Sequence, residues 1–201
     1  MAMFNAKEVN FEDIRIILCV QGYSINSKYV VREIGFWNRE NSGVIPFTSR
    51  TKFYKLSNED KMSVNYLVKV HHGIPLNKQV NYGLMNQEAA AAIKTLYHSC
   101  SNENSERERN YIGICDDMNI YHLLNIAGLG HLVVNLKNLY DKPETTIPSN
   151  NNILKMKEFG YCCLRPCELH DPLSNENIPF CARTKAIILA NWCKSMNNLT
   201  K

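Results

Sequence analysis

Three apolar segments separated by short polar turns begin the chain, and they constrain its fold more than any other feature. The first, 14–21, is almost wholly apolar and rich in β-branched residues, which is typical of a strand buried on both faces. Two more strand-like segments, 28–37 and 44–56, follow after short turns, and Pro46 interrupts the last of them. Consecutive strands joined by short turns pair antiparallel. The sequence therefore predicts an antiparallel meander of three strands.

Helical and strand-like segments alternate after this meander. Ser57, with an acidic residue three positions later, predicts the start of a helix. The expected helices span 57–70, 87–100, 118–127 and 181–197, and the expected strands span 111–115 and 131–136. This order predicts a ribonuclease-H-like α/β fold, in which a mixed five-stranded sheet joins the antiparallel meander to parallel strands and is flanked by helices. A flavodoxin-like sheet would instead begin with a strand–helix–strand unit.

The composition is that of one soluble globular domain. The chain has 201 residues, of which 45% are hydrophobic and 21% are charged, and no linker or internal repeat divides it. We therefore expect one domain over 1–201, with a core at about 14–196. No run of about 18 apolar residues predicts a membrane span, and the N-terminal residues do not resemble a signal peptide. The eight cysteines are therefore expected as reduced thiols or metal ligands in a cytoplasmic or nuclear protein, not a secreted one.

The formal net charge of +4 at pH 7 is mildly basic. Such a charge is compatible with contact to RNA or DNA, but an ordinary globular surface carries it equally well. Several basic residues from separate segments would form a face for phosphates if the fold gathers them: Lys52, Lys55, Lys69, Arg183 and Lys185. Charge alone therefore selects no function.

Cysteine, histidine and glutamate residues in two distant parts of the chain form a candidate metal-ligand set. Cys167 and His170 have a spacing that places two ligands on one tight loop, and Cys181 stands at the start of the last predicted helix. Glu33, on the second predicted strand, completes the set if the fold brings it there. A closed site with four such ligands binds structural zinc. The alternative, in a chain with eight cysteines, is that these are ordinary buried residues.

Three short motifs give the chain a resemblance to a known family. The motif Arg-Glu-Ile-Gly at 32–35 lies on the second predicted strand, and His-His-Gly-Ile-Pro at 71–75 follows the first predicted helix. The third motif is the pair at 167 and 170 followed by the cysteine at 181. Together these motifs resemble the Maelstrom domain, including shorter arthropod proteins that carry this domain without an HMG box. The resemblance covers 14–192, which is nearly the whole chain.

The resemblance implies a zinc site and a field of function. The family's Glu-His-His-Cys-His-Cys series is matched at five positions, by Glu33, one of His71 or His72, Cys167, His170 and Cys181. One family histidine has no counterpart, because the third predicted strand contains no histidine. The zinc-binding subset of the series is complete, so the resemblance implies a structural zinc ion. It also implies binding of single-stranded RNA and a link to small-RNA or transposon silencing.

The family is similar to proofreading exonucleases, which hold two divalent metal ions between carboxylates. At the corresponding positions this chain has Cys19, Asn135 and Lys185, which do not supply the oxygen ligands that Mg²⁺ requires. A two-metal nuclease mechanism is therefore not expected. Asp116 and Asp117 follow a predicted strand, and we interpret them as a helix N-cap pair rather than as metal ligands.

Two classes of function remain for such a domain. The first is a catalytically degenerate domain that binds single-stranded RNA through Lys69, His71, His72, Arg183 and Lys185. Within this class, the adjacent imidazoles of His71 and His72 leave metal-independent RNA cleavage open, so enzymatic activity is undecided. The second class is a protein-interaction module on a pseudonuclease scaffold, because fold alone does not fix function.

Overall fold

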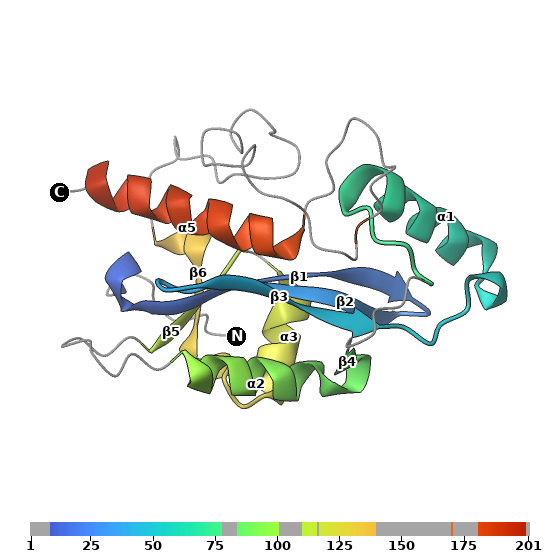
Figure 1. Ribbon diagram of the computed structural model, residues 1–201, viewed down its shortest axis with the longest axis horizontal. Helices are drawn as coiled ribbons and strands as arrows, with labels where there is room; N and C mark the ends of the chain where they lie inside the picture. The colour runs from blue at the N-terminus through green and yellow to red at the C-terminus, as the bar shows by residue number, and fades with distance from the viewer. Residues whose placement is uncertain are drawn as a thin grey trace.

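The computed structural model describes most of the chain. The described residues are 9–77, 84–100, 110–115, 117–139, 170 and 181–199. They form a mixed α/β structure, in which one open sheet is flanked by helices (Figure 1). No helix in this described part is long and apolar enough to cross a membrane.

An antiparallel meander of three strands forms the larger part of the sheet. Its strands are β1 (Ile14–Ile25), β2 (Lys28–Trp37) and β3 (Ser42–Thr48). Asn26 and Ser27 connect β1 to β2 with φ angles of 48° and 59°. This left-handed conformation at both residues matches the twist of a two-residue hairpin turn. The predicted meander is confirmed.

Later strands extend the meander on both sides. β5 (Tyr111–Ile114) pairs with β1, and β6 (Val133–Asn135) pairs with β5, both in parallel. The strand order is β4-β3-β2-β1-β5-β6, so parallel strands are added beside β1 as predicted. The five predicted strands are present, and the structure adds one short edge strand to them, because β4 (Leu84–Met85) pairs in parallel with the outer side of β3. A strand of this length is too short to produce an alternating pattern in the sequence.

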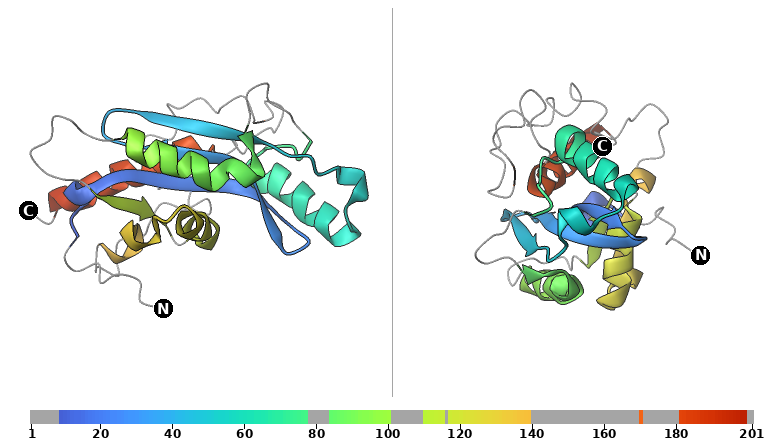
Figure 2. Two further views of the ribbon diagram at one scale, coloured as in Figure 1. Left: turned by 90° about the horizontal axis from the view of Figure 1, so that it is seen from below. Right: turned by 90° about the vertical axis from the view of Figure 1, so that its right-hand side faces the viewer.

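Helices cover both faces of the sheet, as Figures 1 and 2 show. α2 (Ala89–Ser99) and α3 (Met118–Ile126) lie side by side on one face. α5 (Ala182–Leu199) lies along the other face and contacts β1 and β2. α1 (Asn58–Tyr66) lies beyond the end of the meander, on the same side of the sheet as α5.

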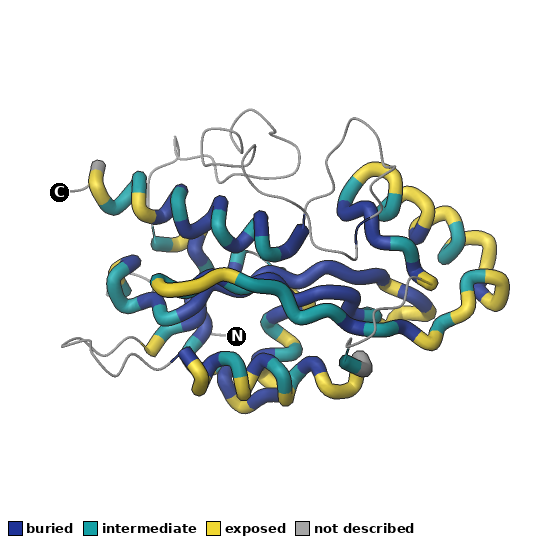
Figure 3. Tube along the Cα trace, in the orientation of Figure 1, coloured by how far each residue is buried: buried dark blue, intermediate teal, exposed yellow. Residues whose placement is uncertain are grey.

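The side chains of β1 fill two cores, one on each side of the sheet. Ile16 and Leu18 pack in the core that contains α2 and α3, whereas Ile17 and Cys19 pack with α5. Successive side chains of a strand point to opposite faces, so a strand that is covered on both sides needs apolar residues at nearly every position. The residues of β1 are accordingly buried along most of its length (Figure 3).

The third strand is shorter than predicted. β3 ends at Thr48, whereas the sequence pattern predicted a strand over 44–56. Beyond Thr48 the chain leaves the sheet and forms a 3₁₀ turn at Phe53–Lys55. Phe53 and Leu56 instead pack in a small core with α1. The apolar side chains in this segment are therefore explained by packing against α1 and not by a strand.

The first predicted helix is confirmed, but its last turn widens. Ser57 caps α1 by accepting a hydrogen bond from the Asp60 N–H at 3.0 Å. From Leu67 to His71 the helix continues as a π-helical turn. Such turns are rare and are frequently found at functional sites. The π-helical turn, which carries Lys69 and His71, is therefore a candidate part of the functional surface.

Asp117 caps helix α3, as the sequence predicted, whereas Asp116 lies outside the described residues. The Asp117 carboxylate accepts hydrogen bonds from the N–H groups of Asn119 at 3.0 Å and Ile120 at 3.3 Å. We expect Asp117→Ala to lower the free energy of unfolding by about 1 kcal/mol, because these donors lose their acceptor. Asp117→Asn keeps a side-chain oxygen that accepts these hydrogen bonds, so it should change the free energy of unfolding little. Urea unfolding measures both, and a large loss with the asparagine variant would contradict a role confined to capping.

Candidate metal centre

Three side chains from distant parts of the chain meet in the interior beside the start of α5. Their donor atoms, from Glu33, His170 and Cys181, all lie within 4.8 Å of one another, and all three residues are buried. His170 Nε2 lies 3.2 Å from Glu33 Oε2, and the Cys181 sulfur lies 3.8 Å from the same oxygen. The structure therefore brings together three of the four predicted ligands.

The spacing of these donor atoms suits a tetrahedral metal ion. With metal–ligand bonds of about 2.0–2.3 Å, the ligands of a tetrahedral ion lie roughly 3.3–3.8 Å apart. The two distances from Glu33 Oε2, 3.2 and 3.8 Å, lie close to the two ends of this range. A set of one oxygen, one nitrogen and one sulfur donor is compatible with zinc and does not suit Mg²⁺, which requires oxygen ligands. The three residues can therefore hold a metal ion.

The second carboxylate oxygen of Glu33 joins β2 to α5. Glu33 Oε1 accepts a hydrogen bond from the Ala182 N–H at 2.5 Å. Glu33 and Gly35 are two residues apart on one strand, so they face the same side of the sheet. A Cβ atom built on Gly35 would overlap the backbone of Ala182 and Arg183. The glycine therefore allows the first turn of α5 to lie directly against β2, which places Cys181 beside Glu33.

The imidazole of His170 is oriented by the segment that follows the π-helical turn. Its Nδ1 donates a hydrogen bond to the backbone carbonyl of His72. This contact leaves Nε2 facing Glu33 and Cys181. Backbone carbonyls often bind the second nitrogen of a metal-ligating histidine in this way, and they fix the tautomer whose Nε2 binds the metal.

Negative charge dominates the candidate metal centre. Burial alone would lower the pKa of His170, but hydrogen bonds with Cys181 and Glu33, together with their charges, raise it to about 10. The site therefore favours a cation beside Glu33, either a proton on the imidazole or a metal ion. A histidine must be neutral to ligate a metal through Nε2, so proton binding and metal binding compete here.

A β-bulge explains how two consecutive charged residues of β2 are both buried. The pairing of β1 with β2 shifts at 21–22, which makes Arg32 an extra residue on β2. The Arg32 guanidinium donates a hydrogen bond to the Leu76 carbonyl at 2.5 Å, and the Tyr23 hydroxyl donates one to the Ile74 carbonyl. These contacts hold the segment 72–76 in place. The His72 carbonyl of this segment also orients the imidazole of His170.

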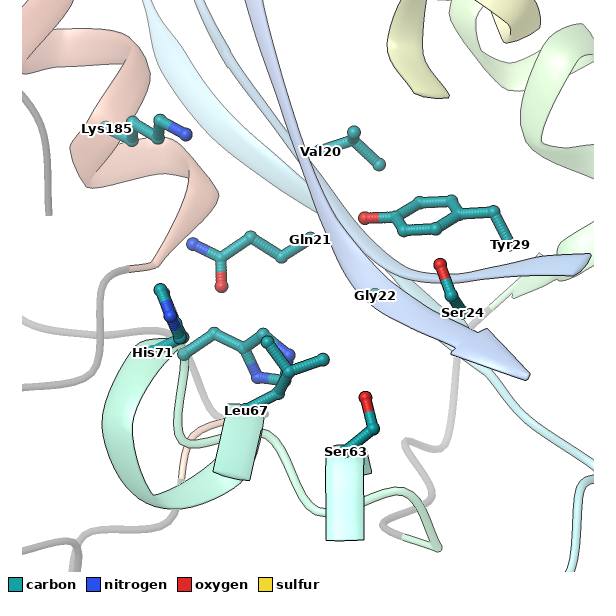
Figure 4. A pocket seen from close by; sticks show the side chains of 10 residues that line it. Val20, Gln21, Gly22, Ser24, Tyr29, Ser63, Leu67, His71 and Lys185 are labelled. Carbon is teal, nitrogen blue, oxygen red and sulfur yellow. The ribbon is translucent and has the colours of Figure 1, made fainter. Parts of the chain in front are cut away.

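A pocket of about 310 Å³ lies between β1 and the π-helical turn, next to this segment (Figure 4). Its lining includes Gln21 of β1, Lys185 of α5, and both His71 and His72. β5 pairs with β1 only within 14–17, so the later half of β1 has β2 as its one partner among the described strands. Burial lowers the pKa of His72 to about 4, so its imidazole is neutral at pH 7. The pocket thus combines an ammonium group, an amide and two imidazoles.

The positions expected to carry nuclease carboxylates are occupied by other groups. Cys19 is buried in β1, and burial raises the pKa of its thiol to about 12, although Lys185 lowers it. The Asn135 side chain accepts a hydrogen bond from the Lys137 N–H at 3.1 Å and so caps the 3₁₀ turn after β6. Within the described part of the chain, the buried centre at Glu33 is the one cluster of three or more histidine, cysteine or acidic residues that suits a metal ion.

The five residues predicted to bind RNA do not all gather at one place. His71, His72 and Lys185 line the pocket, whereas Lys69 and Arg183 are not among its lining residues. Lys69 is exposed on the π-helical turn, and Arg183 is half-buried in the first turn of α5. Residues two apart on a helix do not share a face, so Arg183 and Lys185 point in different directions.

Cys167, the fourth predicted ligand, lies outside the described residues. Sequence reasoning also missed the backbone groups that shape the centre, namely the Ala182 N–H and the His72 carbonyl. Backbone groups are alike in nearly all residues, so no sequence pattern marks them. Gly35 was the one available signal, because a glycine inside a buried strand often marks a close approach of another backbone.

Comparison with protein families, with curated proteins and with solved structures finds no match to this chain. A functional assignment therefore rests on the geometry of the metal centre, the adjacent pocket and the topology of the sheet.

Proposed function

We propose that this chain is a zinc-stabilised, catalytically degenerate ribonuclease-H-like domain of the Maelstrom type that binds single-stranded RNA. The strand order supports the fold, because a three-stranded antiparallel meander with two strands parallel to β1 is the arrangement expected of it. The contacts of the motifs at 32–35 and 71–75 support the family, since both motifs lie at the metal centre. On this proposal the protein acts in the cytoplasm or nucleus, in small-RNA or transposon silencing.

The proposed zinc ion has Glu33, His170 and Cys181 as ligands, and Cys167 as the fourth. Cys167 precedes His170 by three residues, a spacing that is common in structural zinc sites. Four protein ligands leave no position for a reacting water, so such an ion stabilises the fold rather than catalysing a reaction. Its ligands would join β2 to the start of α5 and to the residues around His170.

The pocket lined by Lys185 and His71 is the single observation that carries the RNA-binding proposal. The Lys185 ammonium has no carboxylate partner among the described residues, so it remains available to a phosphate. The metal centre positions both walls of the pocket. The Glu33–Ala182 hydrogen bond fixes the helical turn that carries Lys185, and the bond of His170 to the His72 carbonyl fixes the opposite wall.

Salt dependence of RNA binding tests this proposal. Fluorescence anisotropy with a labelled single-stranded RNA should give a plot of log K against log salt whose negative slope is shallower by about 0.7 in Lys185→Ala, because one phosphate contact is lost. The affinity of this variant should fall to a similar extent for different RNA sequences. Lys94→Ala is the matched control, since it removes the same charge from an exposed position on α2, on the opposite face of the sheet. Equal slopes for both variants and the wild type would overturn the pocket as the RNA site.

Metal-independent RNA cleavage is a second candidate function, supported by the presence of both imidazoles in the same pocket. The neutral His72 imidazole accepts a hydrogen bond from the Ile74 N–H at 3.2 Å through Nδ1 and so helps to hold the wall of the pocket, which leaves His71 as the candidate group for proton transfer or phosphate contact. Cleavage of this kind should survive brief EDTA treatment that leaves the structural metal in place, and His71→Ala should reduce it. Cleavage that requires added Mg²⁺ would contradict the reading of a degenerate nuclease site.

A protein-interaction module is the third candidate. Met62, Tyr66 and Val70 are spaced four residues apart along α1 and the π-helical turn, with exposed fractions of 68%, 55% and 45%. Exposed apolar side chains at this spacing are typical of a helix face that a partner covers. Failure to bind RNA at low salt, together with tight co-purification of a protein through this face, would favour this function.

A further inference from the structure

A second, larger cavity lies where the chain leaves β3. It has a volume of about 600 Å³, which is within the range of roughly 300–1,000 Å³ found for small-molecule sites. Its lining residues are Ser49, Arg50, Thr51, Lys52, Phe53, Tyr54 and Asn77, and we call it the Tyr54 groove. None of these residues lines the pocket at Lys185, so the two cavities are distinct.

The walls of the Tyr54 groove are ordered by local contacts. The Ser49 hydroxyl accepts a hydrogen bond from the Thr51 N–H at 3.1 Å. The Lys55 N–H donates to the Lys52 carbonyl at 2.9 Å and closes the 3₁₀ turn. Phe53 is anchored in the small core beneath α1. The neighbouring side chains of this segment therefore project from a fixed backbone.

Positive charge at the groove is not neutralised by any ion pair within the described part of the chain. Arg50, Lys52 and Lys55 lie in a stretch that contains no acidic residue between Glu40 and Glu59. All three cations are exposed, and none of them forms an ion pair with another described residue. A ligand with negative charges would therefore meet cations that have no competing carboxylate among the described residues.

The groove also presents an aromatic ring to solvent. Tyr54 is 68% exposed, and the Lys52 ammonium lies 5.9 Å from the centre of its ring. An exposed ring next to exposed cations is the combination by which proteins bind single-stranded nucleic acid, with the ring stacking on a base and the cations contacting phosphates. An acidic peptide would use the cations but has no need for the open face of the ring. The observations therefore favour a nucleic acid over a peptide.

We propose that the Tyr54 groove is a second contact site for single-stranded RNA, in which Tyr54 stacks on one base while Arg50 and Lys52 contact the flanking phosphates. This inference rests on the proposed RNA binding and adds to it a site outside the Lys185 pocket. On this inference the RNA bases contact the Tyr54 groove, whereas the RNA phosphates contact both the Tyr54 groove and the Lys185 pocket. The groove accepts any base, because every base offers a flat face to an aromatic ring.

The test compares two labelled oligonucleotides of about 12 nucleotides, which is within the usual range of single-strand binding sites. One carries uracil bases throughout, and the other has the same phosphates but abasic sugars. Fluorescence anisotropy should show that Tyr54→Ala weakens binding of the base-bearing strand by roughly 5- to 150-fold and leaves binding of the abasic strand unchanged. Tyr54→Phe keeps the ring and should bind like the wild type. The exposed position of Tyr54 predicts unchanged melting temperatures for both variants.

The outcomes separate this inference from the proposed function. If Lys185→Ala weakens binding and Tyr54→Ala does not, the groove is overturned while the pocket stands. If Tyr54→Ala weakens binding of the base-bearing strand and Lys185→Ala has no effect, the pocket is overturned while the groove stands. Equal losses for both strands in Tyr54→Ala would overturn base stacking. Tyr54-dependent binding of polyglutamate, without binding of either oligonucleotide, would show that the groove takes an acidic peptide instead.

Discussion

Replacing Cys181 with serine is expected to release the proposed zinc ion and to lower the melting temperature by roughly 10 °C. A metal present at a thousand times its Kd stabilises the folded state by about 4 kcal/mol. For a domain of this size, about 1 kcal/mol corresponds to 2–4 °C in melting temperature. Cys181 is fully buried, so water does not replace its thiolate as a ligand without a rearrangement of the centre. Metal analysis and thermal unfolding measure the two effects.

Cys193→Ser is the matched control for this variant. Cys193 is an equally buried thiol on α5 and does not belong to the metal centre. Serine introduces a buried hydroxyl at either position, so both variants share that cost. Zinc content should fall only in Cys181→Ser. A well-folded wild-type protein without stoichiometric metal would refute the zinc site.

Glu33→Gln separates the metal from the hydrogen bond that Glu33 makes. The amide oxygen of glutamine still accepts a hydrogen bond from the Ala182 N–H, which the structure places 2.5 Å from Glu33 Oε1. The negative charge beside His170 is lost, so metal affinity should fall while the contact between β2 and α5 remains. If the zinc content of this variant equals that of the wild type, Glu33 is not a ligand.

The candidate metal centre shows which parts of a site the sequence can reveal. The grouping of Glu33, His170 and Cys181 was predictable, because few residue types ligate metals and the spacing of Cys167 and His170 resembles that of known sites. The groups that orient them were not predictable. The Ala182 N–H and the His72 carbonyl belong to the backbone, and their position depends on how α5 and the segment after α1 pack on the sheet.

The fold shows a similar division between local pattern and packing. The apolar segment at 14–21 predicted a buried central strand, because a strand covered on both faces has no polar side. The segment at 49–56 has aromatic and apolar residues typical of a strand, yet it packs with α1 and lines the Tyr54 groove. A local sequence pattern indicates that a side chain is apolar or aromatic, but it does not indicate whether that side chain packs in a sheet or against a helix.

Gly35→Ala is expected to separate α5 from β2 and to abolish metal binding. A Cβ atom at this position would overlap the backbone of Ala182 and Arg183, and backbone atoms do not move aside as the end of a flexible side chain does. Overpacking of this kind costs about 1–3 kcal/mol. The movement of Cys181 away from Glu33 would add the loss of the metal, about 4 kcal/mol at a thousand times its Kd. The combined loss, about 5 kcal/mol or more, is comparable to the whole stability of many domains.

Gly43→Ala provides the control for Gly35→Ala, because both put the same methyl group on a strand of the meander. The nearest atoms that a Cβ atom on Gly43 would meet belong to the ring of Phe36, a half-buried side chain that is able to shift. This variant should retain its zinc and melt near the wild-type temperature, whereas Gly35→Ala should contain little zinc even in its soluble fraction. Stoichiometric zinc in Gly35→Ala, with unchanged melting, would show that the close approach of α5 to β2 is not what assembles the centre.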